Sequence, residues 1–235
     1  MARKSRLILA GHAHLVVLRA LADLRPFEAA RDREMFLRAM RDADSAAPVQ
    51  LHAWALLPRE ARLLIRPLEP TALSRWVQAI GRRYVSAYNR VHSRTGTLWS
   101  GRFGCSVVEP GEATLQSMIF VDGSAAEEEA LTSASRNSKA AGVLIHDPPE
   151  YWSLGNTPFD RERAYVGMLS ERLPPSVSSQ IERCLRGGWP FGSAAFLGAI
   201  TLKQPGRAAP RPRGRPRRTS VDMSPNIENQ KKLTY

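Results

Sequence analysis

The chain has 235 residues, 43% of them hydrophobic, and its 34 lysines and arginines outnumber its 22 aspartates and glutamates, giving a formal net charge of +12. This length and apolar content support one or two buried cores and exclude a wholly disordered chain. The positive charge favours a polyanionic partner. The two cysteines, Cys105 and Cys184, are far apart and predict reduced thiols rather than a disulfide framework or a zinc site.

Strand-like and helix-like patterns alternate over the first part of the chain. Residues 14–19 (HLVVLR) are apolar and β-branched, as is typical of a strand, and residues 27–40 have helical periodicity. Residues 49–57 (VQLHAWALL) predict a second strand. A bend at 57–60 then predicts a hairpin whose returning strand covers 61–66.

A helix and a fourth strand complete this pattern, at residues 73–91 and 103–108. The order strand, helix, strand, strand, helix, strand indicates an α+β fold with a ferredoxin-like, split βαβ sheet. We expect the helices to pack on one face of that sheet and the other face to be open to nucleic acid.

Composition divides the chain into three predicted parts. Residues 6–125 form a DNA-binding ferredoxin-like domain, and residues 126–202 form a mostly helical appendage interrupted by prolines at 148–149 and 174–175. Residues 203–235 are rich in proline, arginine and glycine at their start and poor in apolar residues throughout, which predicts a disordered basic tail.

Residues 81–103 (GRRYVSAYNRVHSRTGTLWSGRF) combine a basic helix, a turn and an aromatic loop. Tyr84 and Tyr88 share one helix face, so the helix can pack through that face and bind through the others. An indole and a guanidinium in the loop are the pair that stacks bases and binds phosphate in single-stranded sites. The predicted DNA contacts are Arg82, Arg83, Asn89, Arg90, His92, Arg94, Thr97, Trp99 and Arg102. A solvated surface helix without a ligand is the alternative interpretation.

A second basic segment lies in the tail, where residues 203–218 contain seven basic side chains and no acidic one. Its sequence RGRP resembles an AT-hook, in which arginines lie along a narrow A·T-rich minor groove. The predicted contacts are Arg211, Arg213, Gly214, Arg215, Pro216, Arg217 and Arg218. A nonspecific basic tail is the alternative.

The first 18 residues imitate a signal peptide only superficially. Gly11, His12 and His14 interrupt the apolar stretch, and no small-residue cleavage site follows. We therefore expect a cytoplasmic protein with no membrane partner, associated with the nucleoid if its source is bacterial.

Several segments together resemble the REP-associated tyrosine transposase family over about residues 6–218. They are GHAH, HAWALLP, LLIRP, RTGTLWSGRF, YWSLGNTPFDRERAYVGML and PRPRGRPRR, and RTGTLWSGRF is the most specific of them. That family belongs to the single-tyrosine HUH transposases. The resemblance implies a ferredoxin-like domain that binds hairpin-forming single-stranded DNA.

The chain departs from that family at its metal site. Family members carry a His-hydrophobic-His pair on the third strand, in a segment resembling P-N-H-x-H-L-L, and the pair holds a divalent cation against the scissile phosphate. Glu60 and Arg62 occupy those positions here. A guanidinium repels a cation, so this departure from the family predicts a metal site that is lost or crippled. Because both residues share a strand face, we expect them to pair; a phosphate held by Arg62 without metal is the alternative.

A second departure concerns the nucleophile, which in the family is a tyrosine in a segment resembling Y-I-x-x-N-P. The aligned segment here is MIFVDG and places Met118 at that position, where a thioether cannot form a phosphotyrosine intermediate. Tyr84 and Tyr88 are the nearest alternatives, but their spacing favours packing. His14 and His52 lie in apolar strand patterns, which favours hydrogen-bonded histidines over metal ligands.

Three functions are compatible with these patterns. The first is a transposase-family protein that recognises hairpin or structured single-stranded DNA, is catalytically impaired or domesticated, and needs no cofactor. The alternative is an active tyrosine transposase that cleaves and joins DNA with Mg²⁺ or Mn²⁺, using Glu60, a histidine and a displaced tyrosine. The third is a regulator that binds nucleic acid on its sheet, where Trp54 is the only strong stacking candidate. A homodimer is compatible with the sequence, although no heptad run indicates one.

Overall fold

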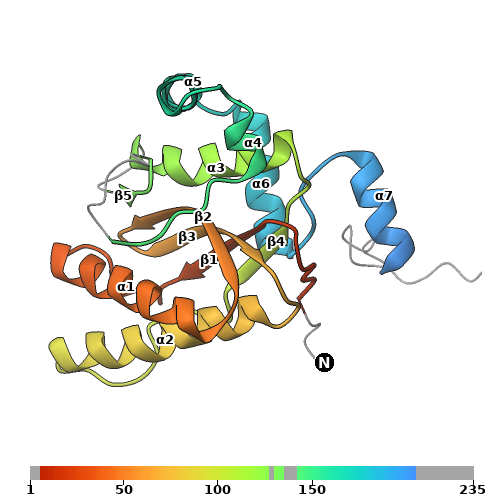
Figure 1. The fold of residues 1–235 in the computed structure, drawn as a ribbon. Helices are drawn as coiled ribbons and strands as arrows, with labels where there is room; N and C mark the ends of the chain where they lie inside the picture. Colours follow the sequence, from red (N-terminus) through yellow and green to blue (C-terminus); the bar gives the residue numbers. More distant parts are fainter. Residues whose placement is uncertain (1–5, 127–129, 135–141, 205–235) are drawn as a thin grey trace, which may run out of the picture.

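The computed structural model describes residues 6–126, 130–134 and 142–204 (Figure 1). The strands are β1 (His14–Arg19), β2 (Val49–Leu57), β3 (Glu60–Pro67), β4 (Gly104–Val107) and β5 (Leu131–Thr132). The helices are α1 (Ala30–Ala43), η1 (Asp44–Ala46), α2 (Ala72–Val91), α3 (Glu112–Asp122), η2 (Gly123–Ala126), α4 (Pro149–Trp152), α5 (Pro158–Glu171), α6 (Pro175–Gly187) and α7 (Ala194–Lys203).

The sheet has the order β4-β1-β3-β2-β5, and every neighbouring pair is antiparallel. Its first four strands, with α1 between β1 and β2 and α2 between β3 and β4, have the connectivity of a ferredoxin-like split βαβ unit. The predicted α+β class and this topology are confirmed. Helices α1 and α2 lie side by side on one face of the sheet, also as predicted (Figure 1).

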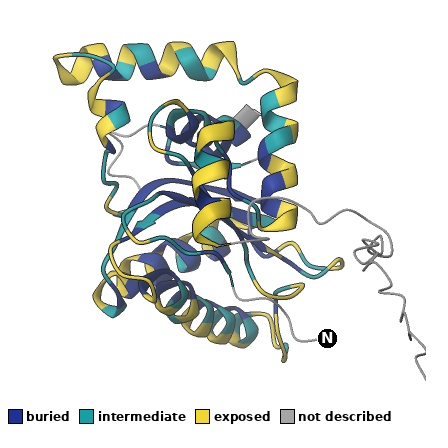
Figure 2. Cartoon of the chain, turned by 90° about the vertical axis from the view of Figure 1, so that its right-hand side faces the viewer, coloured by how far each residue is buried: buried dark blue, intermediate teal, exposed yellow. Residues whose placement is uncertain are grey.

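Apolar side chains bury both faces of the sheet. In β1, Val16 and Leu18 join the core beneath α1 and α2, whereas Leu15 and Val17 point to the opposite face. There they pack in one cluster with residues of α3 and α6 such as Met118. Figure 2 shows the buried strands of the sheet between helices on both sides. The prediction that one sheet face is open to nucleic acid is wrong, because these two helices cover it.

Two-sided burial also changes the role of Trp54. Its side chain is only 4% exposed and belongs to the cluster beneath α1 and α2. An indole in that position cannot stack on a base, so the sheet surface of an RNA-recognition module is not present here.

The chain itself covers the outer edge of β4. The Phe191 N–H donates to the Val107 carbonyl at 2.8 Å, and the Glu109 N–H donates to the Phe191 carbonyl at 2.9 Å. The Ser106 hydroxyl also donates to the Trp189 carbonyl at 2.6 Å. A second copy cannot continue the sheet at this edge, so a homodimer requires another surface.

The remaining features concern the cysteines, the helices and the tail. Cys105 and Cys184 are free and buried, as predicted, and burial raises the pKa of the Cys105 thiol to about 12. Within the three described ranges, no helix combines the length and the hydropathy needed to cross a membrane. Lys203, the first residue of the predicted tail, ends α7. The AT-hook-like residues 211–218 lie outside the described part of the chain.

Candidate nucleic-acid interface

Helix α2 has two distinct faces. Trp76, Ile80, Tyr84 and Tyr88 follow one another at intervals of four residues and are buried against the sheet and α1. Arg75, Gln78, Arg82 and Ser86 form an adjacent stripe that faces a groove. The helix therefore packs through one face and leaves a polar face beside it, as the sequence predicted.

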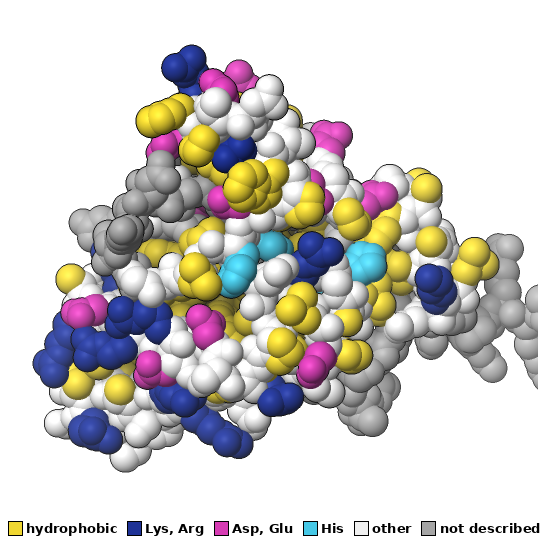
Figure 3. All heavy atoms as spheres, in the orientation of Figure 1, with side chains coloured by type: hydrophobic (Ala, Val, Ile, Leu, Met, Phe, Trp, Pro, Cys, Tyr) yellow, Lys and Arg dark blue, Asp and Glu magenta, His cyan; other side chains and the backbone are white. Residues whose placement is uncertain are grey.

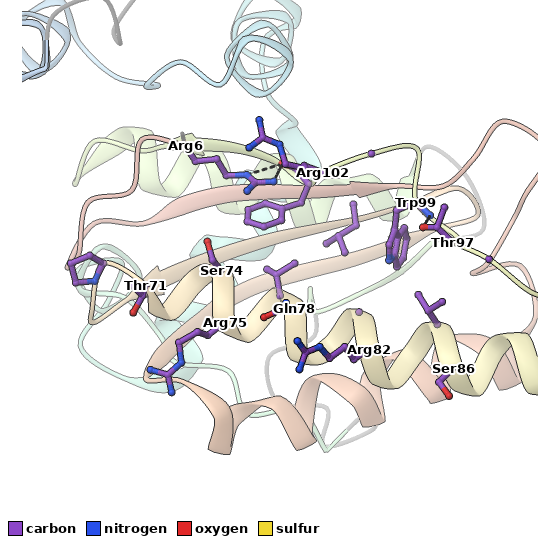
Figure 4. Close-up of a pocket in the computed structure, with 18 residues that line it drawn as sticks. Arg6, Thr71, Ser74, Arg75, Gln78, Arg82, Ser86, Thr97, Trp99 and Arg102 are labelled. Atoms are coloured by element: carbon purple, nitrogen blue, oxygen red, sulfur yellow. Dashed lines mark hydrogen bonds between the residues drawn. The ribbon is translucent and has the colours of Figure 1, made fainter. Parts of the chain in front are cut away.

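This groove, called the α2 groove below, lies between α2 and the loop 96–103 that leads into β4 (Figure 4). Its volume is about 940 Å³. Its floor is apolar, formed by Leu18, Val77, Val85, Trp99 and Phe103. A groove of this size and polarity falls in the range of ligand-binding sites.

Four arginines line the α2 groove: Arg6, Arg75, Arg82 and Arg102. No aspartate or glutamate is among the described residues that line it. Arginine side chains also gather on the surface over α1 and the end of α2 (Figure 3). Arg75 also pairs with Glu69 at 3.9 Å, a carboxylate outside the lining, so the described residues that line the groove carry only positive charge, which suits an anionic ligand.

Trp99 forms one end of the apolar floor. Its ring lies 6.2 Å from the rings of both Phe27 and Tyr84, which fixes the indole against the core. Its Nε1 is buried and has no hydrogen-bond partner within the described residues. A buried donor without an acceptor is uncommon in folded proteins; within the described residues, ring packing and not an indole hydrogen bond holds the Trp99 side chain in place.

Asn89 and Arg94 hold the loop in place. The Asn89 amide donates to the Gly96 carbonyl at 2.8 Å and accepts a hydrogen bond from Arg94 Nη1 at 2.9 Å. Gly96 has a φ of +89°, a conformation that glycine adopts without strain. These contacts clamp the loop to the end of α2 and so position Trp99.

The structure separates the predicted DNA contacts into three groups. It places Arg82, Thr97, Trp99 and Arg102 together in the α2 groove. Asn89, Arg94 and His92 make contacts within the protein, and His92 Nε2 donates to the Asp32 carboxylate at 3.0 Å while its ring stacks on Tyr88. Arg83 and Arg90 are exposed on α2 but do not line the groove.

Sequence reasoning missed Arg6 and Arg75. Arg75 lies three and seven residues before Gln78 and Arg82, so the helical spacing contained a signal for it. Arg6 had no such signal. Its guanidinium lies 3.5 Å above the Phe103 ring, a contact between residues 97 positions apart.

The predicted pairing of Glu60 with Arg62 is confirmed. Arg62 Nε donates to Glu60 Oε1 at 2.6 Å, and Arg19 Nε donates to Glu60 Oε2 at 3.1 Å. Arg62 Nη1 also donates to the Ser124 hydroxyl at 2.8 Å. The carboxylate lies between two guanidiniums at the edge of a cavity of about 440 Å³, which is unfavourable for a divalent cation.

The histidines and Met118 have structural roles. His14 is fully buried; its Nδ1 donates to the His12 carbonyl and its Nε2 accepts from the Leu9 N–H, and burial lowers its pKa to about 4. His52 is 2% exposed and donates to a backbone carbonyl at 2.6 Å. Both agree with the prediction of hydrogen-bonded core histidines. Met118 is fully buried.

Within the described residues, no group of three or more histidine, cysteine, aspartate and glutamate side chains is arranged to hold a metal ion.

Tyr84 lies in the core, as its spacing predicted. Its hydroxyl donates to the Pro26 carbonyl, and burial raises its pKa far above the usual range of a phenol.

No family model and no curated protein matches this chain. Among solved structures, a REP-associated tyrosine transposase bound to a REP hairpin is similar over 61% of this chain and 88% of its own, with 13% identity and a TM-score of 0.49. A Deinococcus radiodurans protein described as a "putative transposase" is similar over 46% of this chain and 88% of its own, with 17% identity and a TM-score of 0.35. Both TM-scores lie below 0.5, so neither likeness carries an argument about the function of this chain.

Proposed function

We propose that this protein binds hairpin or other structured single-stranded DNA through the α2 groove. The observation that carries the proposal is the lining of that groove, which combines four arginines with the aromatic rings of Trp99 and Phe103 and has no acidic residue among its described members. Guanidiniums bind backbone phosphates, and aromatic rings stack on bases that are not paired. The sequence resemblance to REP-associated tyrosine transposases supports the choice of hairpin-forming DNA.

We further infer that binding occurs without metal-dependent cleavage. Glu60, at the first of the two positions where the resembled family has histidine, already accepts hydrogen bonds from Arg19 and Arg62. A cation would have to displace two guanidiniums to reach this carboxylate. This arrangement supports a site that has lost its metal.

The exposure of the tyrosines supports the same inference. A nucleophilic hydroxyl must reach the phosphorus atom of its substrate. The four tyrosines in the described ranges are at most 7% exposed; they are Tyr84, Tyr88, Tyr151 and Tyr165. An active tyrosine transposase would therefore need a rearranged core or a tyrosine beyond these ranges.

The tail is proposed as a second DNA contact. Residues 211–218 place five arginines beside glycine and proline, a composition suited to the minor groove of A·T-rich duplex. A hairpin with a duplex stem would then engage both the groove and the tail.

The experiment uses the full chain and a labelled hairpin oligonucleotide with single-stranded flanks, in the presence of Mg²⁺ or Mn²⁺. We expect retention of the oligonucleotide on a native gel, with neither a nicked strand nor a covalent protein-DNA adduct on a denaturing gel. A tyrosine transposase that cleaves its own hairpin serves as the control. An adduct would contradict the loss of cleavage, and an absence of retention would contradict DNA binding.

A further inference from the structure

Arg6 is fixed in an unusual position for a basic residue near a chain end. Its guanidinium lies 3.5 Å above the Phe103 ring, and its Nε and Nη2 both donate to the Phe103 carbonyl, at 3.1 and 3.0 Å. A guanidinium has five N–H donors, so these two contacts hold the group while three donors remain for other acceptors. The side chain is therefore ordered before any ligand arrives.

Arg102 lies close to this guanidinium. Figure 4 shows the two side chains together on one wall of the α2 groove, while Arg75 and Arg82 extend from α2 on the other wall. The pKa of Arg6 is lowered, first by burial and then by the positive charge of Arg102. Two like charges that lie close together repel each other, and an anion between them would offset the repulsion.

We propose that Arg6 and Arg102 form a phosphate-binding pair whose ligand is a phosphate group of a nucleotide. The identity of the natural ligand rests on the proposed function: the bound group is a backbone phosphate of single-stranded DNA. Guanidiniums bind phosphate oxygens with two parallel hydrogen bonds, and a preordered guanidinium loses little freedom in doing so.

The apolar floor next to the pair selects a nucleotide over a bare anion. Val77, Val85 and Trp99 line the groove between the two walls of arginines. A base can lie on this floor while its phosphate contacts the pair, whereas inorganic phosphate gains nothing from an apolar surface.

The first test measures how the affinity for a labelled single-stranded oligonucleotide depends on salt. Each phosphate contact to a single strand adds about 0.7 to the slope of log Kd against log salt concentration. We expect Arg102→Gln and Arg6→Gln each to lower the slope by about 0.7. When the salt concentration is raised fourfold, the factor by which Kd rises should then be roughly 2.5-fold smaller for each variant than for the wild type. Arg25→Gln is the matched control, because Arg25 is exposed, pairs with Glu28 at 3.2 Å and does not line the groove.

Arg6 also holds Phe103, so its variant could act through the loop. Arg102→Gln keeps those contacts of Arg6, and thermal melting of each variant separates a loosened loop from a lost phosphate contact. Slopes equal to that of the wild type in both Arg102→Gln and Arg6→Gln would overturn the phosphate pair.

The second test separates this inference from the proposed function by competition with thymidine monophosphate, thymidine and inorganic phosphate. We expect thymidine monophosphate to compete best, and its advantage over thymidine to disappear in Arg102→Gln. If the oligonucleotide binds but the variants keep the wild-type slope, DNA binding stands and the pair is wrong. If the protein binds thymidine monophosphate through the pair but no oligonucleotide, the pair stands and the proposed function is wrong.

Discussion

Replacing Arg62 with methionine removes the guanidinium that, within β3, pairs with Glu60 and joins this strand to Ser124 of η2. The side chains of Arg62 and Glu60 are 13% and 18% exposed, so their ion pair at 2.6 Å is largely shielded from water. A hydrogen bond to a charged group contributes about 1.5–3 kcal/mol, and the bond to the Ser124 hydroxyl falls in the same class. Because Glu60 keeps Arg19 as a partner, we expect Arg62→Met to lower the free energy of unfolding by about 3 kcal/mol in total.

Arg38→Met is the matched control. Arg38 pairs with Glu34 at 2.7 Å, nearly the same distance, but these side chains are 59% and 66% exposed. An exposed pair of this spacing on a helix contributes about 0.3–0.5 kcal/mol. The comparison therefore separates the effect of burial on the free energy of unfolding from the effect of the distance between the paired atoms.

The assay is urea unfolding followed by tryptophan fluorescence, with the slope of the transition checked for each variant. A loss in Arg62→Met below about 1 kcal/mol, similar to that in Arg38→Met, would refute the reasoning. Such a result would indicate that Arg62 is not needed to hold Glu60, and would favour the alternative in which Arg62 binds a phosphate.

Three further predictions concern the core, the loop and the tail. His14 has a folded pKa of about 4 against about 6.5 in the unfolded chain, so the unfolded state binds more protons between these values. Stability contributed by neutral His14 should be complete above pH 6.5 and fall as the pH drops towards 4, and His14→Gln should flatten that part of the pH profile of unfolding. Asn89→Ala and Arg94→Ala should each weaken hairpin binding by loosening the loop. The double variant should lose no more affinity than the more damaging single variant, because both substitutions break the same set of contacts. Additive losses of affinity would mean that the two residues make separate DNA contacts. Deleting residues 206–235 should reduce the salt dependence of duplex binding, and an unchanged slope would remove the tail from the account.

The sequence predicted the sheet well because its strands have strong local signals. The run HLVVLR at 14–19 has four consecutive apolar residues at its centre, and the predicted strand coincides with β1. The same run also contained the signal that was misread, since an unbroken apolar strand is typical of burial on both faces. The second face is covered by helices at residues 112–122 and 175–187. The latter lies in the predicted helical appendage, but only the tertiary structure revealed that both helices pack on the sheet.

The candidate site was predictable where neighbours in sequence are neighbours in space. Glu60 and Arg62 are two residues apart on one strand, and their pairing followed from that spacing. Roles that depend on distant partners were not visible. Asn89 and Arg94 had the residue types of DNA contacts, yet their acceptor and donor groups face the loop. Arg6 entered the groove only through its contact with Phe103.

The central claim, that the α2 groove binds single-stranded DNA, is tested most directly by a comparison at constant net charge. We would titrate one labelled hairpin with the double variants Arg82→Gln/Arg102→Gln and Arg31→Gln/Arg38→Gln by fluorescence anisotropy. The second pair is exposed on α1 and does not line the groove. We expect the groove variant to bind at least about tenfold more weakly than the wild type and the α1 variant to stay within about twofold. Equal losses in both variants would contradict it, because the charge of the protein and not the groove would then govern binding.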